Sequence, residues 1–280
     1  MIAIENNNYI VELNLLGGQI ASFKDKMLGL EYMWDADKEY WGYSSPTLFP
    51  VIGSSHDNQY HFNGQTTSIP NHGILRNAEF DILKNDKVET VLKLSANSET
   101  LKQYPFYFKM LITYTLENNK LLIQYEIFNE GVIDMPFNFG LHPAFNCPID
   151  PSKNFDDYRL EFSSPTKLLG CGPMVNEGLV SHINLKRDLF ETFPTFIYHN
   201  VNSAYLSLTD GNHGVKVSLN GFPITAVWTP NDKKAKFVCL EPWLGLSKKT
   251  DKDLAFEKRD SIMTIKPGKK RLFTYTITVY

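Results

Sequence analysis

Three short segments interrupt a strand-like sequence with side chains that can move protons or bind hydroxyl groups. They are residues 69–76, 138–145 and 238–243, and their polar members are His72, Arg76, His142, Glu241 and the indole of Trp243. A histidine and a glutamate can together deliver one proton and remove another near neutral pH, because an unperturbed histidine titrates near ~6.5. The three segments therefore point to general acid–base chemistry.

His142 lies between apolar Leu141 and Pro143. A proline favours an extended conformation at the residue before it, which would hold the imidazole in one direction, as a proton donor requires. The alternative interpretation is a core histidine bonded to a backbone group.

Glu241 follows the apolar strand that we expect at residues 237–240. A carboxylate is rare there unless it is paired or functional. We expect Pro242 to end the strand, so that Glu241 faces a cleft at the strand end; a solvent-facing glutamate is the alternative. Trp243 offers a flat apolar face on which sugars can stack and an N–H to donate, although plain core packing would also account for it.

His72 and Arg76 belong to a segment that Pro70 and Gly73 predict to be a loop. The guanidinium of an arginine suits a pair of hydroxyls or a phosphate, but a lone arginine is more often a surface residue. The sequence has no Gly-rich phosphate loop, no nucleophile elbow and no metal-ligand spacing. We therefore expect no metal site.

The elements that must position these residues are strands, because apolar residues recur with a period of two almost throughout. Alternation predicts strands at residues 9–15, 19–23, 88–94, 106–116, 121–128, 205–209, 215–219 and 272–279, with hairpin turns at 117–120 and 210–212. Short helices are expected at 98–103, capped by Ser98, and at 185–191. Neither a fixed-period repeat nor a flexible linker is present, so we expect one all-β domain over residues 1–280, a large antiparallel sandwich or a barrel.

Composition excludes several classes of protein. The 280 residues are 42% hydrophobic and 21% charged, which is typical of a globular protein. A net charge of −3 gives no electrostatic indication of nucleic-acid or membrane binding. The sequence has no run of 18 apolar residues, the length that would span a membrane. Three cysteines make a poor disulfide framework, and the first residues do not resemble a signal peptide, so we expect a cytoplasmic protein with free thiols.

Taken together, the motifs His72-Gly73-x-x-Arg76, Gly140-Leu-His142-Pro-x-Phe145 and Leu240-Glu241-Pro-Trp243 resemble those of the aldose 1-epimerases. The LacX-type branch, which is related to the hexose-6-phosphate mutarotases, is the most similar. The resemblance covers essentially the whole chain, including residues 16–20 and 48–53. It implies a galactose mutarotase-like β-supersandwich of twisted antiparallel sheets.

The resemblance also implies roles for individual residues. His142 matches the general acid that protonates the sugar ring oxygen, and Glu241 matches the general base at the anomeric hydroxyl. His72 matches a substrate-positioning histidine, Arg76 a sugar-contacting arginine. We expect Trp243 and Phe145 among the substrate-binding residues, and the reaction requires no metal or organic cofactor.

The predicted function is interconversion of the α and β anomers of a free aldohexose such as galactose or glucose, with the sugar as the partner. The alternatives are a non-catalytic carbohydrate-binding or sugar-sensing protein on the same fold, a hexose-6-phosphate mutarotase, and a glycoside hydrolase or lyase. A binding protein does not need both His142 and Glu241. A hydrolase usually needs two carboxylates, and only Glu241 has a convincing setting.

Two departures from the family pattern concern the sugar. The family often places a sugar-binding aspartate after a Leu-Phe pair, but residues 188–195 have none at that place, which leaves Asp188 and Glu191 as candidate replacements. Phosphosugar branches tend to carry an arginine after the segment that ends at Gly53. Here Ser54, Ser55 and His56 follow, which favours an unphosphorylated sugar, although Arg76 remains.

Overall fold

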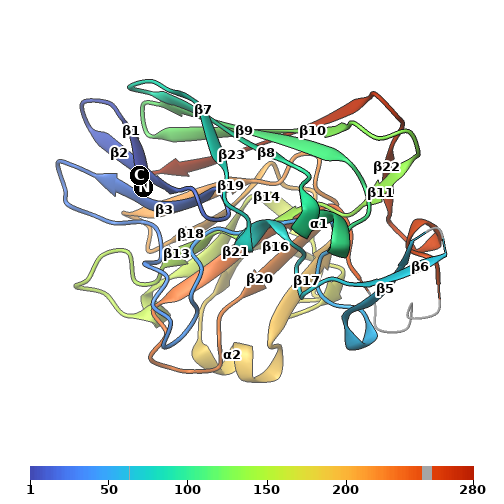
Figure 1. Cartoon of the computed structure of the whole chain (residues 1–280). Coiled ribbons are helices and arrows are strands. Elements are labelled where there is room, and N and C mark those ends of the chain that lie inside the picture. Colours follow the sequence, from blue (N-terminus) through green and yellow to red (C-terminus); the bar gives the residue numbers. More distant parts are fainter. Residues whose placement is uncertain (63, 248–253) are drawn as a thin grey trace.

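Two large antiparallel sheets pack on one another in the computed structural model, which describes residues 1–62, 64–247 and 254–280 (Figure 1). Within those residues the larger sheet has nine strands, in the order β16 (Leu179–Asn184), β14 (Arg159–Lys167), β18 (Tyr205–Thr209), β19 (Gly214–Ser218), β23 (Lys270–Val279), β10 (Lys120–Asn129), β9 (Phe108–Glu117), β8 (Glu89–Ser95) and β7 (Asp81–Asn85). The all-β prediction is confirmed.

The second sheet carries the residues singled out from the sequence. Its order is β15 (Gly170–Cys171), β17 (Thr195–His199), β20 (Ile224–Trp228), β21 (Phe237–Trp243), β12 (Gly140–Leu141) and β4 (Thr47–Leu48), and β13 (Ala144–Asn146) also pairs with β21.

Smaller elements complete the described chain. They are the sheet β1 (Ile2–Glu5), β2 (Tyr9–Asn14) and β3 (Gln19–Asp25), the pairs β5 (Gln59–Phe62) with β6 (Gln65–Ser68) and β11 (Met135–Phe137) with β22 (Met263–Ile265), the helices α1 (Ser98–Gln103) and α2 (Arg187–Thr192), and 3₁₀ turns at His56–Asn58, Leu75–Asn77, Phe155–Asp157 and Phe256–Lys258. No helix among the described residues is long and apolar enough to cross a membrane.

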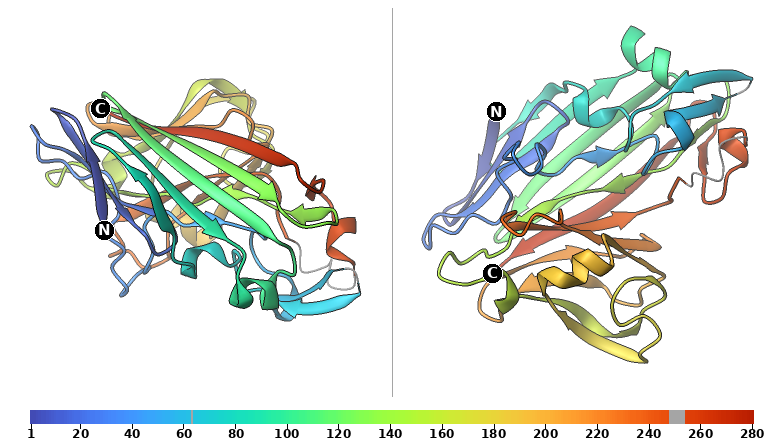
Figure 2. Two further views of the ribbon diagram at one scale, coloured as in Figure 1. Left: turned by 45° about the horizontal axis from the view of Figure 1, so that its top comes forward. Right: turned by 90° about the horizontal axis from the view of Figure 1, so that it is seen from below.

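The long hairpin of β9 and β10 shows why the alternating pattern gives strands. Met110, Ile112 and Tyr114 are buried and alternate with partly exposed residues, and Ile112 pairs with Tyr125 on the neighbouring strand. β23 pairs with the other edge of β10, so the three strands lie side by side (green and red in Figure 2). Both predicted hairpins are confirmed.

The main hydrophobic core lies between the two large sheets. Alternate residues of the second sheet, including Phe196, Val227, Val238 and Leu240, belong to the same buried cluster as the inner residues of β9, β10 and β23. Successive side chains of a strand point to opposite faces. The remaining residues of β17, β20 and β21 therefore face away from this core.

The two helices differ in detail from the sequence prediction. α1 begins at Ser98 as expected, but its cap is Asn97, whose side chain accepts hydrogen bonds from the amides of Glu99 and Thr100. A residue before the first helical turn is better placed to reach those free amides than Ser98, which is already helical. α2 begins at Arg187 rather than at residue 185, because the amide of Leu185 still donates to the carbonyl of Tyr158 and Lys186 is extended.

Pro242 does not end β21, contrary to the prediction, since the strand continues to Trp243. The amides of Leu240 and Leu244 donate to the carbonyls of Pro143 and Phe139. Residue 242 lies midway between residues 240 and 244, so its backbone nitrogen faces the same neighbouring segment. It does so at the break between β12 and β13. Proline has no N–H, and at this break no hydrogen bond between strands is lost. The same break places His142 beside Glu241.

Candidate active site

A cavity of about 370 Å³ opens on the face of the second sheet that points away from the main core. Its strand residues share one face of their strands: Thr195 and Ile197 on β17, Trp228 on β20, and Glu241 and Trp243 on β21. Loops and β4 supply the other lining residues, Trp41, Pro46, Leu48, Gly53, Asn71, His72, Arg76 and His142. The three motifs therefore meet in one cavity, although they are far apart in the sequence.

Glu241 lies between two small apolar clusters on this face. One holds Trp34, Ala144, Ala235, Phe237 and Cys239, and the other Leu48, Ile52, Ile224, Ala226 and Trp243. The side chain of Glu241 is consequently only 1% exposed. A carboxyl group in such surroundings is costly to ionise unless it has a partner.

The partner is His142, whose Nε2 lies 3.1 Å from Oε2 of Glu241. His142 is 6% exposed. Neither carboxylate oxygen, nor Nδ1 of His142, makes a hydrogen bond of good geometry with the described residues. The site therefore offers buried hydrogen-bonding groups that a polar ligand can satisfy.

Burial sets the protonation of this pair. It raises the pKa of Glu241 well above its usual range, opposed by the nearby indole N–H of Trp243. Burial lowers the pKa of His142 well below 6.5. The charge of a protonated His72 and the charge of Arg76 lower it further. Both shifts favour the neutral forms, a carboxyl group at Glu241 and an imidazole at His142, which together hold one proton that either residue could carry.

The imidazole rings of His72 and His142 are nearly perpendicular, with 5.4 Å between the ring centroids. The amide of Gly53 donates to Nδ1 of His72 at 3.2 Å. Burial, with a smaller effect of Arg76, lowers the pKa of His72 to about 4. Since Nδ1 accepts a hydrogen bond, the proton of the neutral ring resides on Nε2, which can donate to a ligand.

The loop that carries His72 is tightly constrained. His72 has a φ of 64° and Gly73 a φ of 89°. A Cβ atom at Gly73 would lie 2.0 Å from the carbonyl oxygen of Phe49. Only glycine accommodates this approach, which fixes the direction in which His72 enters the cavity.

Arg76 brings a permanent positive charge to the cavity. Its guanidinium lies over the ring of Tyr43, 4.9 Å from the centroid, and its Nε is buried without a hydrogen-bond partner. No ion pair with a carboxylate is found for Arg76 in the described part of the chain. Arg76 is therefore available to a polar or anionic ligand.

Trp243 lines the cavity, and its Nε1 is buried without a partner among the described residues. The structure adds two tryptophans that the sequence interpretation did not single out. The indole of Trp41 stacks on the imidazole of His142, and Trp228 meets the same imidazole edge-on at 5.7 Å. Alternation along β20 could have indicated Trp228, whereas Trp41 lies in a loop without a recognisable pattern.

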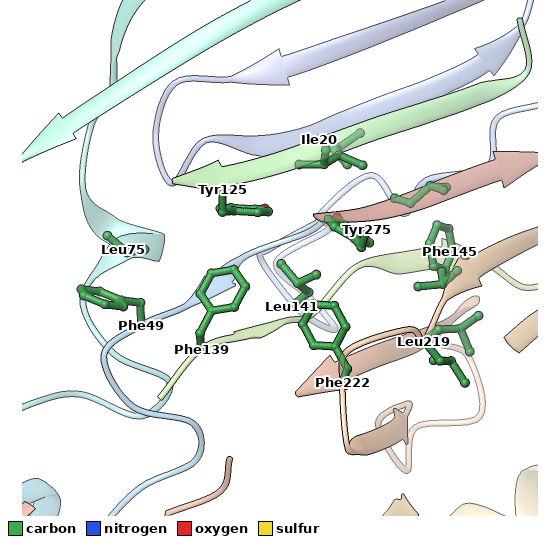
Figure 3. Packing of buried hydrophobic residues seen from close by; sticks show 14 of the residues in the cluster. Ile20, Phe49, Leu75, Tyr125, Phe139, Leu141, Phe145, Leu219, Phe222 and Tyr275 are labelled. Carbon is green, nitrogen blue, oxygen red and sulfur yellow. The ribbon is translucent and has the colours of Figure 1, made fainter. Parts of the chain in front are cut away.

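Phe145 does not belong to this cavity, and we correct its expected role. Along β13 Ala144 faces the cluster beside Glu241, so the next side chain points to the opposite face. Phe145 is fully buried in the main core (Figure 3).

The two acidic residues considered as replacements for the family's aspartate do not line the cavity either. Asp188 and Glu191 belong to α2, and Glu191 pairs with Lys233 at 3.0 Å. The residue of that segment that reaches the cavity is Thr195, which follows the helix and begins β17.

Comparison with known proteins supports the same interpretation of the motifs. The profile of the family described as aldose 1-epimerase matches residues 1–278. The chain belongs to the aldose 1-epimerase family. The chromosomal LacX protein of Lactococcus lactis subsp. lactis is 29% identical to this chain in an alignment of 297 positions. The alignment covers 99% of this chain and 99% of the LacX protein.

Solved structures of this family have the same fold. A galactose mutarotase related enzyme from Lactobacillus acidophilus has a TM-score of 0.88 and 32% identity, covering 99% of this chain and 96% of that one. A galactose mutarotase-like protein from Lactobacillus casei has a TM-score of 0.88 and 28% identity, covering 100% of both. The resemblance inferred from the motifs, including the LacX branch, is confirmed.

Proposed function

We propose that the protein is an aldose 1-epimerase that interconverts the α and β anomers of a free aldohexose such as galactose or glucose. The observation that carries the proposal is the buried pair His142–Glu241, 3.1 Å apart, at a cavity of about 370 Å³. Mutarotation requires one group to remove a proton from O1 and another to deliver a proton to the ring oxygen O5. The pair provides one of each within a single sugar ring's reach.

Ring opening in this scheme begins with Glu241 as carboxylate and His142 as imidazolium. Glu241 removes the proton of O1–H, the C1=O1 bond forms, the C1–O5 bond breaks, and His142 delivers its proton to O5. Rotation about C1–C2 presents the other face of the aldehyde. Closure reverses every step: His142 removes the proton of O5–H and Glu241 returns one to O1.

The environment of the pair fits this cycle. After ring opening Glu241 is a neutral acid and His142 a neutral imidazole, the forms that burial favours. Before it, the shared proton must move from Glu241 to His142. Sugar hydroxyls and the indole N–H of Trp243 can stabilise the carboxylate through hydrogen bonds, which lowers the energy of that transfer.

The remaining polar groups suit sugar recognition. His72 can donate from Nε2, Asn71 and Arg76 line the same cavity, and Trp41, Trp228 and Trp243 offer flat apolar faces. Sugars present both hydroxyl edges and apolar C–H faces, so this mixture of donors and aromatic rings is complementary to them.

Polarimetry tests the proposal. Freshly dissolved α-D-galactose and α-D-glucose should lose their excess optical rotation faster with the purified protein than without it, and the ratio of the two rates ranks the sugars. If the protein accelerates neither sugar but binds them in a calorimeter, the non-catalytic carbohydrate-binding alternative replaces this proposal.

Arg76 favours a second candidate, a hexose 6-phosphate as substrate, because it places an unpaired guanidinium at the cavity. Comparing kcat/KM for glucose and glucose 6-phosphate decides between them. An Arg76→Ala variant should raise KM in either case. If the wild type prefers the phosphorylated substrate, Arg76→Ala should abolish that preference. If the wild type prefers the free sugar, the variant should raise KM for the free sugar.

A further inference from the structure

Cys239 lies on the same face of β21 as Glu241, two residues before it. One nitrogen of His142, the Sγ of Cys239 and one carboxylate oxygen of Glu241 all lie within 4.8 Å of one another. All three side chains are buried, and Cys239 makes no disulfide. The described residues hold no other such group of three histidine, cysteine or acidic side chains.

These donors are suited to one kind of ligand. A nitrogen, a sulfur and an oxygen donor from histidine, cysteine and glutamate form a set that Zn²⁺ accepts. Donors of a tetrahedral zinc site lie roughly 3.5 Å apart, given metal–ligand distances of ~2.0–2.3 Å. Shortening the longest separations in the present cluster by at most about 1.3 Å would give that geometry.

Charge and hydrogen bonding favour the same ligand. Both oxygens of Glu241 are buried without a hydrogen bond of good geometry to any described residue. A divalent cation would satisfy them and offset the two negative charges that a carboxylate and a thiolate would otherwise bury. His142 and Glu241 line the cavity, so the fourth position of the cation would open towards it.

We propose that His142, Cys239 and Glu241 form an open, three-ligand site for a zinc-like divalent cation, which inhibits the protein by occupying its acid–base pair. Binding of the cation is independent of the function proposed above, and only the inhibition rests on it. The cation and the sugar compete for the same two side chains, so each should weaken the binding of the other.

Cobalt(II) provides the test, since it adopts zinc-like geometry and a bound thiolate gives it a charge-transfer absorption. Titration of the metal-free wild-type chain should give this absorption with a stoichiometry of one. In Cys239→Ser the absorption should disappear and the affinity fall by at least about tenfold. Cys147→Ser is the matched control, because Cys147 is also a free, buried thiol but lies outside the cluster; its titration should equal that of the wild type.

Absence of the absorption in the wild type overturns the proposal, as does its persistence in Cys239→Ser. Circular dichroism establishes whether that variant is folded. If it is not, His142→Asn, which keeps Cys239, replaces it: the affinity for cobalt should again fall at least about tenfold, and an unchanged affinity overturns the proposal. Because the readout is absorbance, an inactive wild type would contradict the proposed function without affecting this result.

Discussion

The indole of Trp41 lies nearly parallel to the imidazole of His142, with ring centroids 4.7 Å apart and an angle of 26° between the planes. Trp41 also stacks on Phe237, and its carbonyl accepts a hydrogen bond from the indole of Trp34 at 2.9 Å. The loop residue is thereby held in place. A π face next to an imidazolium stabilises the charged form, so Trp41 can support His142 in the state in which it carries the proton.

Replacing Trp41 should therefore affect catalysis more than binding. In Trp41→Leu we expect kcat to fall about tenfold, from the loss of roughly 1.4 kcal/mol of stabilisation of the imidazolium, with a smaller change in KM. Trp41→Phe keeps an aromatic face and should recover most of kcat. Steady-state kinetics of the two variants check this, and equal kcat values for leucine and phenylalanine would show that the aromatic face does not matter.

The dependence of activity on pH should reflect the single proton of the His142–Glu241 pair. The active form of the pair carries one proton. At lower pH the pair takes up a second proton, when His142 becomes protonated beside a neutral Glu241. Because the pKa of His142 is lowered well below 6.5, kcat/KM should stay level as the pH falls through 6.5. A loss of half the activity near pH 6.5 would mean that His142 titrates as an ordinary histidine.

His72 should make the fold less stable in acid. Its pKa is about 4 in the folded chain against 6.5 as a free side chain. Between these values the unfolded chain binds a proton that the folded chain does not, so the free energy of unfolding decreases as the pH falls from 6.5 to 4, by up to about 3 kcal/mol. Asparagine tolerates the positive φ of this position, so His72→Asn is a suitable variant. Between pH 7 and pH 4.5 its free energy of unfolding in urea should decrease less than that of the wild type. An equal decrease would assign the acid sensitivity to other groups.

Gly73 should be among the least replaceable residues of the site. In Gly73→Ala the new Cβ would lie 2.0 Å from the carbonyl oxygen of Phe49, in addition to the strain of a positive φ. Gly29 has a similar φ of 70° but open space around it, which makes Gly29→Ala a matched control. We expect the control to cost about 1 kcal/mol and Gly73→Ala more than about 3 kcal/mol in urea unfolding. Similar losses would mean that the loop shifts readily.

The sequence predicted the strands and the three motifs of the site because both depend on local patterns. Alternation gave the hairpin of β9 and β10, and the polar residues stood out against it. The continuation of β21 through Pro242 could not be predicted, since it depends on the break between β12 and β13 on the neighbouring strands. Phe145 was misplaced for a related reason: its motif puts it near His142 in sequence, but one step along a strand turns its side chain to the opposite face.

Trp41 and Cys239 were missed for different reasons. Trp41 reaches His142 from a loop whose path depends on contacts with Trp34 and Phe237, and no period in the sequence encodes it. Cys239 was open to prediction, because a residue two positions before Glu241 in a strand must share its face. The interpretation of the cysteines as a sparse set without zinc spacing overlooked that relationship.

The most direct test of the proposed function is the rate of mutarotation of α-D-galactose and α-D-glucose by Glu241→Gln beside the wild type. Glutamine has nearly the same shape and resembles the neutral carboxyl group that burial favours, so the fold should be retained. We expect the wild type to accelerate the decay of optical rotation. The variant should be slower by a factor of about 10²–10⁴, the typical effect of removing one acid–base partner. A folded Glu241→Gln protein with the turnover of the wild type would contradict the assignment of Glu241 as the base.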